Sequence, residues 1–122
     1  MVKRILIGDD DPNIILSLEF LLAQAGFEVR TAGNGEEILQ AVERFRPDLV
    51  LLDIMLPLKN GFEVCQTLRG NPSCAGLKIV MLTAKGRASE AAKGLALGAD
   101  AYVTKPFGTR DLMKTVRGLL AA

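Results

Sequence analysis

Five polar side chains follow four short apolar runs of the sequence, and side chains of these types can take part in phosphate or metal chemistry. Asp9 and Asp10 come after the first of these runs, Asp53 after the second, Thr83 after the third and Lys105 after the fourth. If the runs are parallel strands of one sheet, their carboxyl ends lie along one edge, which is where open α/β sheets bind ligands. Three carboxylates, a hydroxyl and an ammonium group would then converge there.

The three carboxylates would lie close enough to repel one another. Neighbouring strands are about 4.8 Å apart, and two like charges about 4 Å apart repel by about 4 kcal/mol at an effective dielectric constant near 20. Lys105 can supply one compensating positive charge. A metal ion could compensate the remaining negative charge, and hard oxygen ligands with room for water favour Mg²⁺ over zinc. The residue types therefore predict a magnesium site that includes Asp9, Asp10 and Asp53.

Asp11 has a simpler interpretation than its two neighbours. It stands directly before Pro12, and an Asp followed by Pro is typical of a helix N-cap and first helical position. The helix dipole also favours an acidic group there. Capping accounts for Asp11, but it does not account for Asp9, Asp10 or the distant Asp53.

The apolar runs alternate with longer segments of helical periodicity. The expected strands are Arg4–Gly8, Phe27–Thr31, Asp48–Leu52, Lys78–Leu82 and Ala101–Thr104. The candidate helix N-caps are Asp11, Asn34, Asn60 and Thr109, and the glycines expected at helix ends are Gly26 and Gly98. The pattern predicts five strands that alternate with five helices.

Right-handed crossovers between such strands give a doubly wound parallel sheet, a (βα)5 fold of the flavodoxin-like type. The third and fourth strands are almost entirely apolar, as central strands covered on both faces should be. The second strand, Phe27–Thr31, alternates in polarity and is therefore placed at an edge, which favours the order 2-1-3-4-5. The length suits one domain, residues 1–122, with a single core.

Composition excludes several classes of function. The net charge is +1, so there is no overall field for nucleic acid, and no apolar stretch reaches the roughly 20 residues that span a membrane. The chain has no histidine that could act as a base, a ligand or a phosphoryl carrier. Cys65 fits a buried helix face and Cys74 a polar loop, with no metal or disulfide spacing. We expect a cytoplasmic protein without a signal peptide.

Four motifs in the chain resemble the receiver domain of two-component response regulators, including the chemotaxis regulators. They are Ile5–Pro12, Leu52–Pro57 with Gly61, Leu82–Ala84 and Lys105–Phe107, and they cover essentially the whole chain in the order and spacing of the family. The resemblance implies a phosphorylation-activated switch that takes a phosphoryl group from a histidine kinase or a histidine phosphotransfer protein. It implies no turnover enzyme, only autophosphotransfer and slow hydrolysis of the acyl phosphate.

The resemblance also implies roles for the acidic residues. Asp53 would accept the phosphoryl group in a Mg²⁺-dependent reaction. Asp9, Asp10 and Asp53, with the backbone carbonyl of Met55, would bind the ion. Met55 and Lys85 match the two variable positions that control the access of water to the phosphoryl group, and the apolar Met55 is expected to slow hydrolysis.

The other site residues would report the arrival of the phosphoryl group. Thr83 and Lys105 match the hydroxyl and the ammonium group that bond to it, and Tyr102 matches the aromatic residue whose rotamer follows Thr83. Pro106 matches a proline preceded by a cis peptide bond. The change would reach an output surface formed by the fourth helix, the fifth strand and the fifth helix, which would address an unknown partner or a fused effector domain.

The same surface mediates dimers of winged-helix regulators through ion pairs. Asp100 and Arg117 match one such pair, but Ala91, Ala101 and Thr115 stand where charged residues are expected. We therefore expect a monomer or a weak dimer.

Three other functions use a similar sheet. A Mg²⁺-dependent phosphohydrolase usually carries Asp-x-Asp after the first strand, whereas the expected acceptor here follows the third. A nucleotide- or flavin-binding protein needs a glycine-rich phosphate loop, and the first strand-to-helix turn has three acids instead. A third alternative is a receiver-like protein that is never phosphorylated. Only one observation speaks against it, namely that all the residues that match the family motifs are intact.

Overall fold

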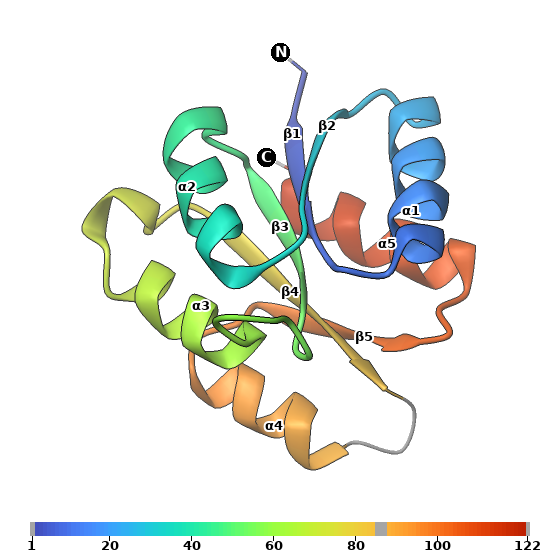
Figure 1. The fold of residues 1–122 in the computed structure, drawn as a ribbon. Helices are drawn as coiled ribbons and strands as arrows, with labels where there is room; N and C mark the ends of the chain where they lie inside the picture. The colour runs from blue at the N-terminus through green and yellow to red at the C-terminus, as the bar shows by residue number, and fades with distance from the viewer. Residues whose placement is uncertain (1, 85–87, 122) are drawn as a thin grey trace.

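The computed structural model describes residues 2–84 and 88–121. Five parallel strands form one sheet in the order β2-β1-β3-β4-β5, with helices on both faces (Figure 1). The strands are β1 (Arg4–Gly8), β2 (Glu28–Ala32), β3 (Leu49–Asp53), β4 (Lys78–Ala84) and β5 (Ala101–Lys105). The predicted (βα)5 fold, its strand order and the edge position of the second strand are confirmed.

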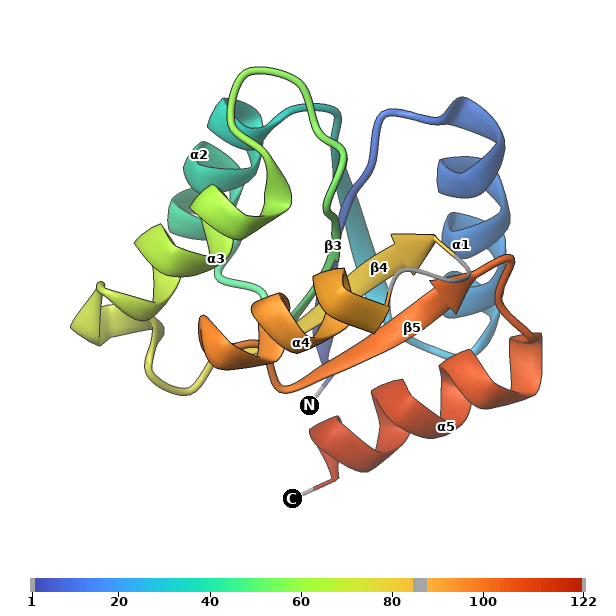
Figure 2. The same ribbon diagram turned by 90° about the horizontal axis from the view of Figure 1, so that it is seen from below.

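The helices cover the sheet in two layers. They are α1 (Pro12–Gln24), α2 (Gly35–Phe45), α3 (Gly61–Arg69), α4 (Ala88–Ala96) and α5 (Thr109–Leu120), with a short 3-10 helix, η1 (Pro72–Cys74). Figure 2 shows α1 and α5 on one side of the sheet and the other three α-helices on the opposite side. Each connection crosses from one strand to the next parallel strand, as a doubly wound sheet requires.

Two hydrophobic clusters lie on the two faces of the sheet. Successive side chains of a strand point to opposite faces, so Leu49 and Leu51 join the cluster beneath α1 and α5, while Val50 and Leu52 join the cluster beneath α2 and α3. All four side chains are fully buried. β3 is therefore a central strand fixed from both sides, and it holds its last residue, Asp53, in a defined place.

Three of the four predicted helix caps are confirmed. The side chains of Asp11, Asn34 and Asn60 accept hydrogen bonds from backbone N–H groups in the first turns of their helices, and Asn60 forms the expected capping box. The prediction for Thr109 was wrong. Gly108 is the cap residue, with an extended backbone and no side-chain cap, and Thr109 is already the first residue of α5. Its hydroxyl therefore stands one residue too late to cap the helix.

Asp53, Thr83 and Lys105 belong to the strands themselves, whereas Asp9 and Asp10 follow the end of β1. β3, β4 and β5 end one or two residues later than predicted, so Asp53 pairs with Leu82, Thr83 with Thr104 and Lys105 with Ala84. β2 and β3 also begin one residue later than predicted. The later ends of β3, β4 and β5 fix the backbone of Asp53, Thr83 and Lys105 in the hydrogen-bonded sheet.

The two cysteines are free and buried. Cys65 lies in α3 with no exposed surface, as predicted. Cys74 is not a loop residue, as had been predicted: it ends η1 and is only 7% exposed. Arg69 donates hydrogen bonds to the carbonyl oxygens of Cys74 and Leu77, at 3.3 and 2.7 Å, and these bonds hold the segment against the sheet. No helix in the described ranges has the length and apolar character needed to cross a membrane.

Candidate functional site

The carboxyl ends of β1 and β3 bring three carboxylates together. One carboxylate oxygen from each of Asp9, Asp10 and Asp53 lies within 4.8 Å of the others. Asp9 is fully buried and Asp53 is 6% exposed, whereas Asp10 is exposed. Such hard oxygen donors, open to solvent on one side, fit Mg²⁺, which keeps several of its water ligands in proteins.

Lys105 reaches this acidic cluster from the end of β5. Its Nζ lies 2.8 Å from Oδ2 of Asp9 and 3.3 Å from Oδ2 of Asp53. Three carboxylates and one ammonium group leave a formal charge of −2 at the site. A divalent cation would neutralise that charge, so the donor set and the charge both fit the ion.

The pKa values of Asp53 and Lys105 reflect this crowding. Burial raises the pKa of the Asp53 carboxyl above its ordinary value, and the negative charge of Asp9 raises it further; Lys105 and the Met55 N–H only partly offset these effects. Burial acts to lower the pKa of Lys105, but the hydrogen bond to Asp9 and the charges of Asp53 and Asp9 outweigh it and raise the pKa. Lys105 is therefore held as a cation, while the charged form of Asp53 is disfavoured.

Backbone hydrogen bonds orient the two buried carboxylates. The N–H of Asp11 donates to Oδ1 of Asp9 at 3.0 Å, and the N–H of Met55 donates to Oδ1 of Asp53 at 3.2 Å. A side chain on Gly61 would overlap the carbonyl oxygen of Asp53, so glycine lets α3 begin directly against the end of β3. The Gly61 N–H donates to the carbonyl of Ile54 at 2.9 Å and closes this loop.

Met55 and Asp11 fall where the sequence suggested. Met55 follows β3 within this loop, and its side chain is 73% exposed, beside the site. Asp11 uses its side chain to cap α1 by accepting the N–H of Asn13 at 2.9 Å, and it is not a member of the carboxylate cluster. Lys85, the other position expected to control water access, lies outside the described residues.

Thr83 and Tyr102 lie on the two strands next to the acidic cluster. Thr83 is 3% exposed in β4, and Tyr102 is 47% exposed in β5, where it pairs with Met81. Residues two apart on a strand share a face, so Thr83 and Tyr102 are diagonal neighbours on the same side of the sheet. The Lys105–Pro106 peptide bond is cis, as predicted.

Asp100 has a partner that the sequence did not reveal. Its Oδ2 accepts hydrogen bonds from Arg69 at 2.6 Å and from the N–H of Ile79 at 2.8 Å. Arg69 also donates to the carbonyl oxygen of Gly98 at 2.7 Å. The residue that matches one half of a dimer ion pair with Arg117 is thus bonded within the chain. No periodicity or motif pointed to Arg69, because its partners come from two separate segments, one before β4 and one before β5.

The chain matches one protein family over most of its length. Residues 5–117 match the profile of the response regulator receiver domain. Over 120 residues, or 98% of the chain, it is 47% identical to "DNA-binding response regulator MtrA" of Mycolicibacterium smegmatis and 43% identical to "Alkaline phosphatase synthesis transcriptional regulatory protein PhoP" of Bacillus subtilis. These matches cover 51% and 49% of the two relatives, so the chain spans about half their length.

Solved structures agree with this match. A putative response regulator from Chloroflexus aurantiacus superposes with a TM-score of 0.96 at 38% identity, over 100% of both chains. This likeness agrees with the family match and with the observed fold.

Proposed function

This chain belongs to the response regulator receiver domain family, and on that basis we propose that Asp53 accepts a phosphoryl group from a histidine of a partner kinase or phosphotransfer protein. Members of this family act as phosphorylation-activated switches in two-component signalling and are not, in general, turnover enzymes. One observation carries the assignment of Asp53. Its carboxylate ends a central strand, lies among two further carboxylates and is 3.3 Å from Lys105.

Asp9, Asp10 and Asp53 are the residues that would hold Mg²⁺, together with the backbone carbonyl of Met55. The carboxylate oxygens within 4.8 Å of one another and the formal charge of −2 support this assignment. When bound, the ion supplies positive charge that offsets the charge on the transferring phosphoryl oxygens. Asp10 is exposed, so the ion can reach the site from solvent.

Asp53 acts as the nucleophile in this proposal. An oxygen of its carboxylate forms a bond to phosphorus while the bond between phosphorus and the donor nitrogen breaks, and the electron pair of that bond stays on the nitrogen. The carboxylate has no proton to lose, so this chain needs no general base. Lys105, kept charged by Asp9, stabilises the phosphoryl oxygens during transfer. A small donor such as acetyl phosphate can serve in the same way.

Thr83 and Lys105 convert the modification into a change of shape. The phosphoryl group offers acceptor oxygens that only the modified protein has, and both side chains gain bonds to it. Such a differential interaction shifts an existing two-state equilibrium. Tyr102, at the β5 edge, follows Thr83, and the change reaches the surface formed by α4, β5 and α5. The acyl phosphate then decays slowly by hydrolysis, and the apolar Met55 helps to slow that decay.

The proposal also covers the setting of the domain. Residues 1–122 act as one cytoplasmic receiver domain, a monomer or weak dimer that binds no nucleic acid itself. The relatives are named as DNA-binding or transcriptional regulators, and about half of each lies outside the match. We infer that the output is a DNA-binding effector, either a fused domain or a separate partner.

Intact-mass spectrometry after incubation with acetyl phosphate and Mg²⁺ tests the assignment of Asp53. Wild type should gain the mass of one phosphoryl group, and the gain should disappear in Asp53→Ala and when a chelator removes the metal. Asp11→Asn is the matched control, because Asn caps a helix as well as Asp does, and it should be phosphorylated like wild type. Phosphorylation of Asp53→Ala, or repeated turnover of a phosphomonoester, would contradict the proposal.

A further inference from the structure

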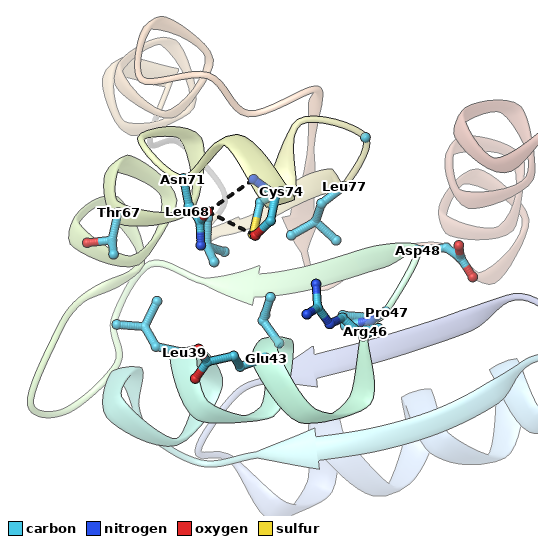
Figure 3. A pocket seen from close by; sticks show the side chains of 13 residues that line it. Leu39, Glu43, Arg46, Pro47, Asp48, Thr67, Leu68, Asn71, Cys74 and Leu77 are labelled. Carbon is cyan, nitrogen blue, oxygen red and sulfur yellow. Dashed lines mark hydrogen bonds between the residues drawn. The ribbon is translucent and has the colours of Figure 1, made fainter.

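A cavity of about 500 Å³ lies between α2 and α3, beside the beginning of β3 (Figure 3). It is therefore at the opposite end of β3 from Asp53. Its floor is apolar and consists of the buried side chains of Val42, Leu68, Cys74 and Leu77. The volume is within the range of small-molecule sites, and such sites combine an apolar lining with a few polar groups. The phosphorylation site uses none of these residues.

Arg46 stands at the mouth of this cavity in a left-handed backbone conformation, with φ of 54°. A residue with a Cβ adopts this conformation at a cost, and glycine is usual at such a helix end. Glycine does occupy the helix ends at Gly26 and Gly98. Figure 3 shows the Arg46 side chain reaching over the cavity, and within the described ranges its guanidinium has no hydrogen-bond or ion-pair partner.

Glu43 supplies the opposite charge one helical turn before Arg46. It lines the same cavity from α2, and no described residue forms an ion pair with its carboxylate. The third charged residue of the lining, Asp48, is already engaged: its Oδ2 accepts the N–H of Arg4 at 2.8 Å, and Figure 3 shows it pointing away from the cavity. The cavity thus offers one cation, one anion and an apolar floor, together with the polar side chains of Thr67, Asn71 and Ser73, of which Asn71 and Ser73 are hydrogen-bonded to each other.

We propose that this cavity binds an apolar α-amino acid. The ligand carboxylate pairs with the Arg46 guanidinium, the ammonium group pairs with Glu43, and the side chain lies on the apolar floor. A guanidinium is suited to bidentate recognition of a carboxylate. A ligand that carries only a negative charge would be repelled by Glu43. A ligand that carries only a positive charge would be repelled by Arg46. A zwitterion with an apolar body pairs with both charged groups on the α2 side of the cavity and covers its apolar floor.

Three probes with the same apolar body separate the parts of this proposal by isothermal titration calorimetry. L-Phenylalanine should bind with a Kd on the order of 0.1–1 mM, the range expected of about a dozen heavy atoms at ordinary ligand efficiency. 3-Phenylpropionate lacks the ammonium group and 2-phenylethylamine lacks the carboxylate. Each should bind at least about tenfold more weakly. No saturable binding of L-phenylalanine at about 10 mM, or equal binding of the three probes, would overturn the proposal.

Two substitutions place the binding in the cavity. Arg46→Gly removes the guanidinium and suits the left-handed backbone, so the variant should fold and should lose binding. Gly76 lines the mouth, and a Cβ there would meet nothing within 4 Å, so Gly76→Leu should place its side chain in the open space and should also lose binding. Gly118 also has open space around it, in α5. Gly118→Leu is therefore the matched control, and it should bind like wild type.

The thiol of Cys74 gives a second, local readout. L-Phenylalanine should slow the alkylation of Cys74 by iodoacetamide at least about twofold at saturation, because the ligand covers the floor that Cys74 helps to form. Cys65, which has no exposed surface, is the internal reference. Binding that survives both cavity substitutions, or that is lost in Gly118→Leu, would locate the ligand elsewhere and reject this site. Unchanged alkylation of Cys74 at saturation would do the same.

Discussion

The two ends of the sheet each carry a cluster of charged side chains, and the two clusters are balanced in opposite ways. At the carboxyl end, three carboxylates share one ammonium group among the residues that the structure describes, that of Lys105. At the amino end, where β4 and β5 begin, one carboxylate, Asp100, meets one guanidinium, Arg69. Both clusters join segments far apart in the sequence, but only the second is electrically neutral.

The two clusters also differ in the number of hydrogen-bond donors that face their acceptors and in the balance of their charges. Arg69 donates to Asp100 and to the carbonyl oxygens of Cys74, Leu77 and Gly98. Asp53 accepts the N–H of Met55 and lies 3.3 Å from Nζ of Lys105, but burial and the negative charge of Asp9 still raise its pKa. A neutral, saturated cluster contributes to stability, whereas an excess of like charge costs stability and is typical of functional sites. The comparison predicts that substitutions at the two ends have opposite effects on stability.

Arg69→Ala should have the largest effect. It removes the guanidinium that donates to Asp100 and to three carbonyl oxygens. Among the described residues, Asp100 keeps only the N–H of Ile79 and the Cys74 carbonyl only that of Leu77, so the free energy of unfolding should fall by about 2–3 kcal/mol. This is somewhat below the cost of breaking a fully buried pair, because both side chains are about one quarter exposed. Urea denaturation measures it. Arg44→Ala, an exposed arginine of α2, is the control and should change stability by less than about 0.5 kcal/mol. Equal losses of stability in Arg69→Ala and Arg44→Ala would show that the cluster of Arg69 and Asp100 does not stabilise the protein.

Mg²⁺ should stabilise the carboxyl-end cluster. At about ten times its Kd, an ion that binds only the folded state raises the free energy of unfolding by about 1.4 kcal/mol. Thermal denaturation with and without Mg²⁺ measures this gain. The gain should be much reduced in Asp10→Asn and kept in Asp11→Asn, since Asp11 caps α1 and is not in the cluster. If Asp11→Asn loses the gain as well, the ion binds elsewhere.

Asp53→Asn should stabilise the protein at pH 7 by about 1 kcal/mol in the absence of metal, because it removes one of several crowded like charges. The pKa of Asp53 is raised from 3.8 in the folded state, so the native carboxyl binds its proton more readily than the unfolded one. The loss of stability that the charged Asp53 causes in wild type is therefore complete above the pKa of the folded state. It disappears as the pH falls toward 3.8.

Measurements of unfolding between pH 4 and pH 7 check this dependence. The advantage of Asp53→Asn should shrink as the pH falls. Asp100→Asn is the matched substitution at the other end of the sheet, and it should lose stability, because its carboxylate is paired with Arg69. If Asp53→Asn destabilised the protein at pH 7, substitutions in the two clusters would not have opposite effects on stability.

Gly8→Ala should have the smallest effect, a loss of about 0.5–1 kcal/mol. Gly8 lies directly before Asp9, and a Cβ there would overlap the Cδ1 atom of Ile38, which packs from α2. The overlap is with the flexible end of a side chain, so it is partly relieved by a shift. Ile38→Val removes that methyl group, and the double variant should lose less stability than the two single losses added together. Additive losses would mean that Ile38 does not set the packing behind Asp9.

Much of the fold and of the site follows from the sequence, because the signals are local or topological. The caps at Asp11, Asn34 and Asn60 depend only on residues within one helical turn. The convergence of Asp9, Asp53 and the other strand-end residues needs only the topology, since parallel strands bring their carboxyl ends to one edge. The roles of these residues in phosphoryl transfer remain predictions until Asp53→Ala is tested.

The side-chain contacts at the amino end of the sheet could be learned only from the tertiary structure. Arg69 bonds to residues between five and 31 positions away, and nothing in the periodicity of α3 indicates which carbonyl oxygens will face it. The same packing buries Cys74 and leaves Arg46 over a cavity between two helices. Apolar and polar spacing determines which elements form and how they connect. It does not determine where side chains from separate loops meet, because that depends on how closely the helices pack against the sheet.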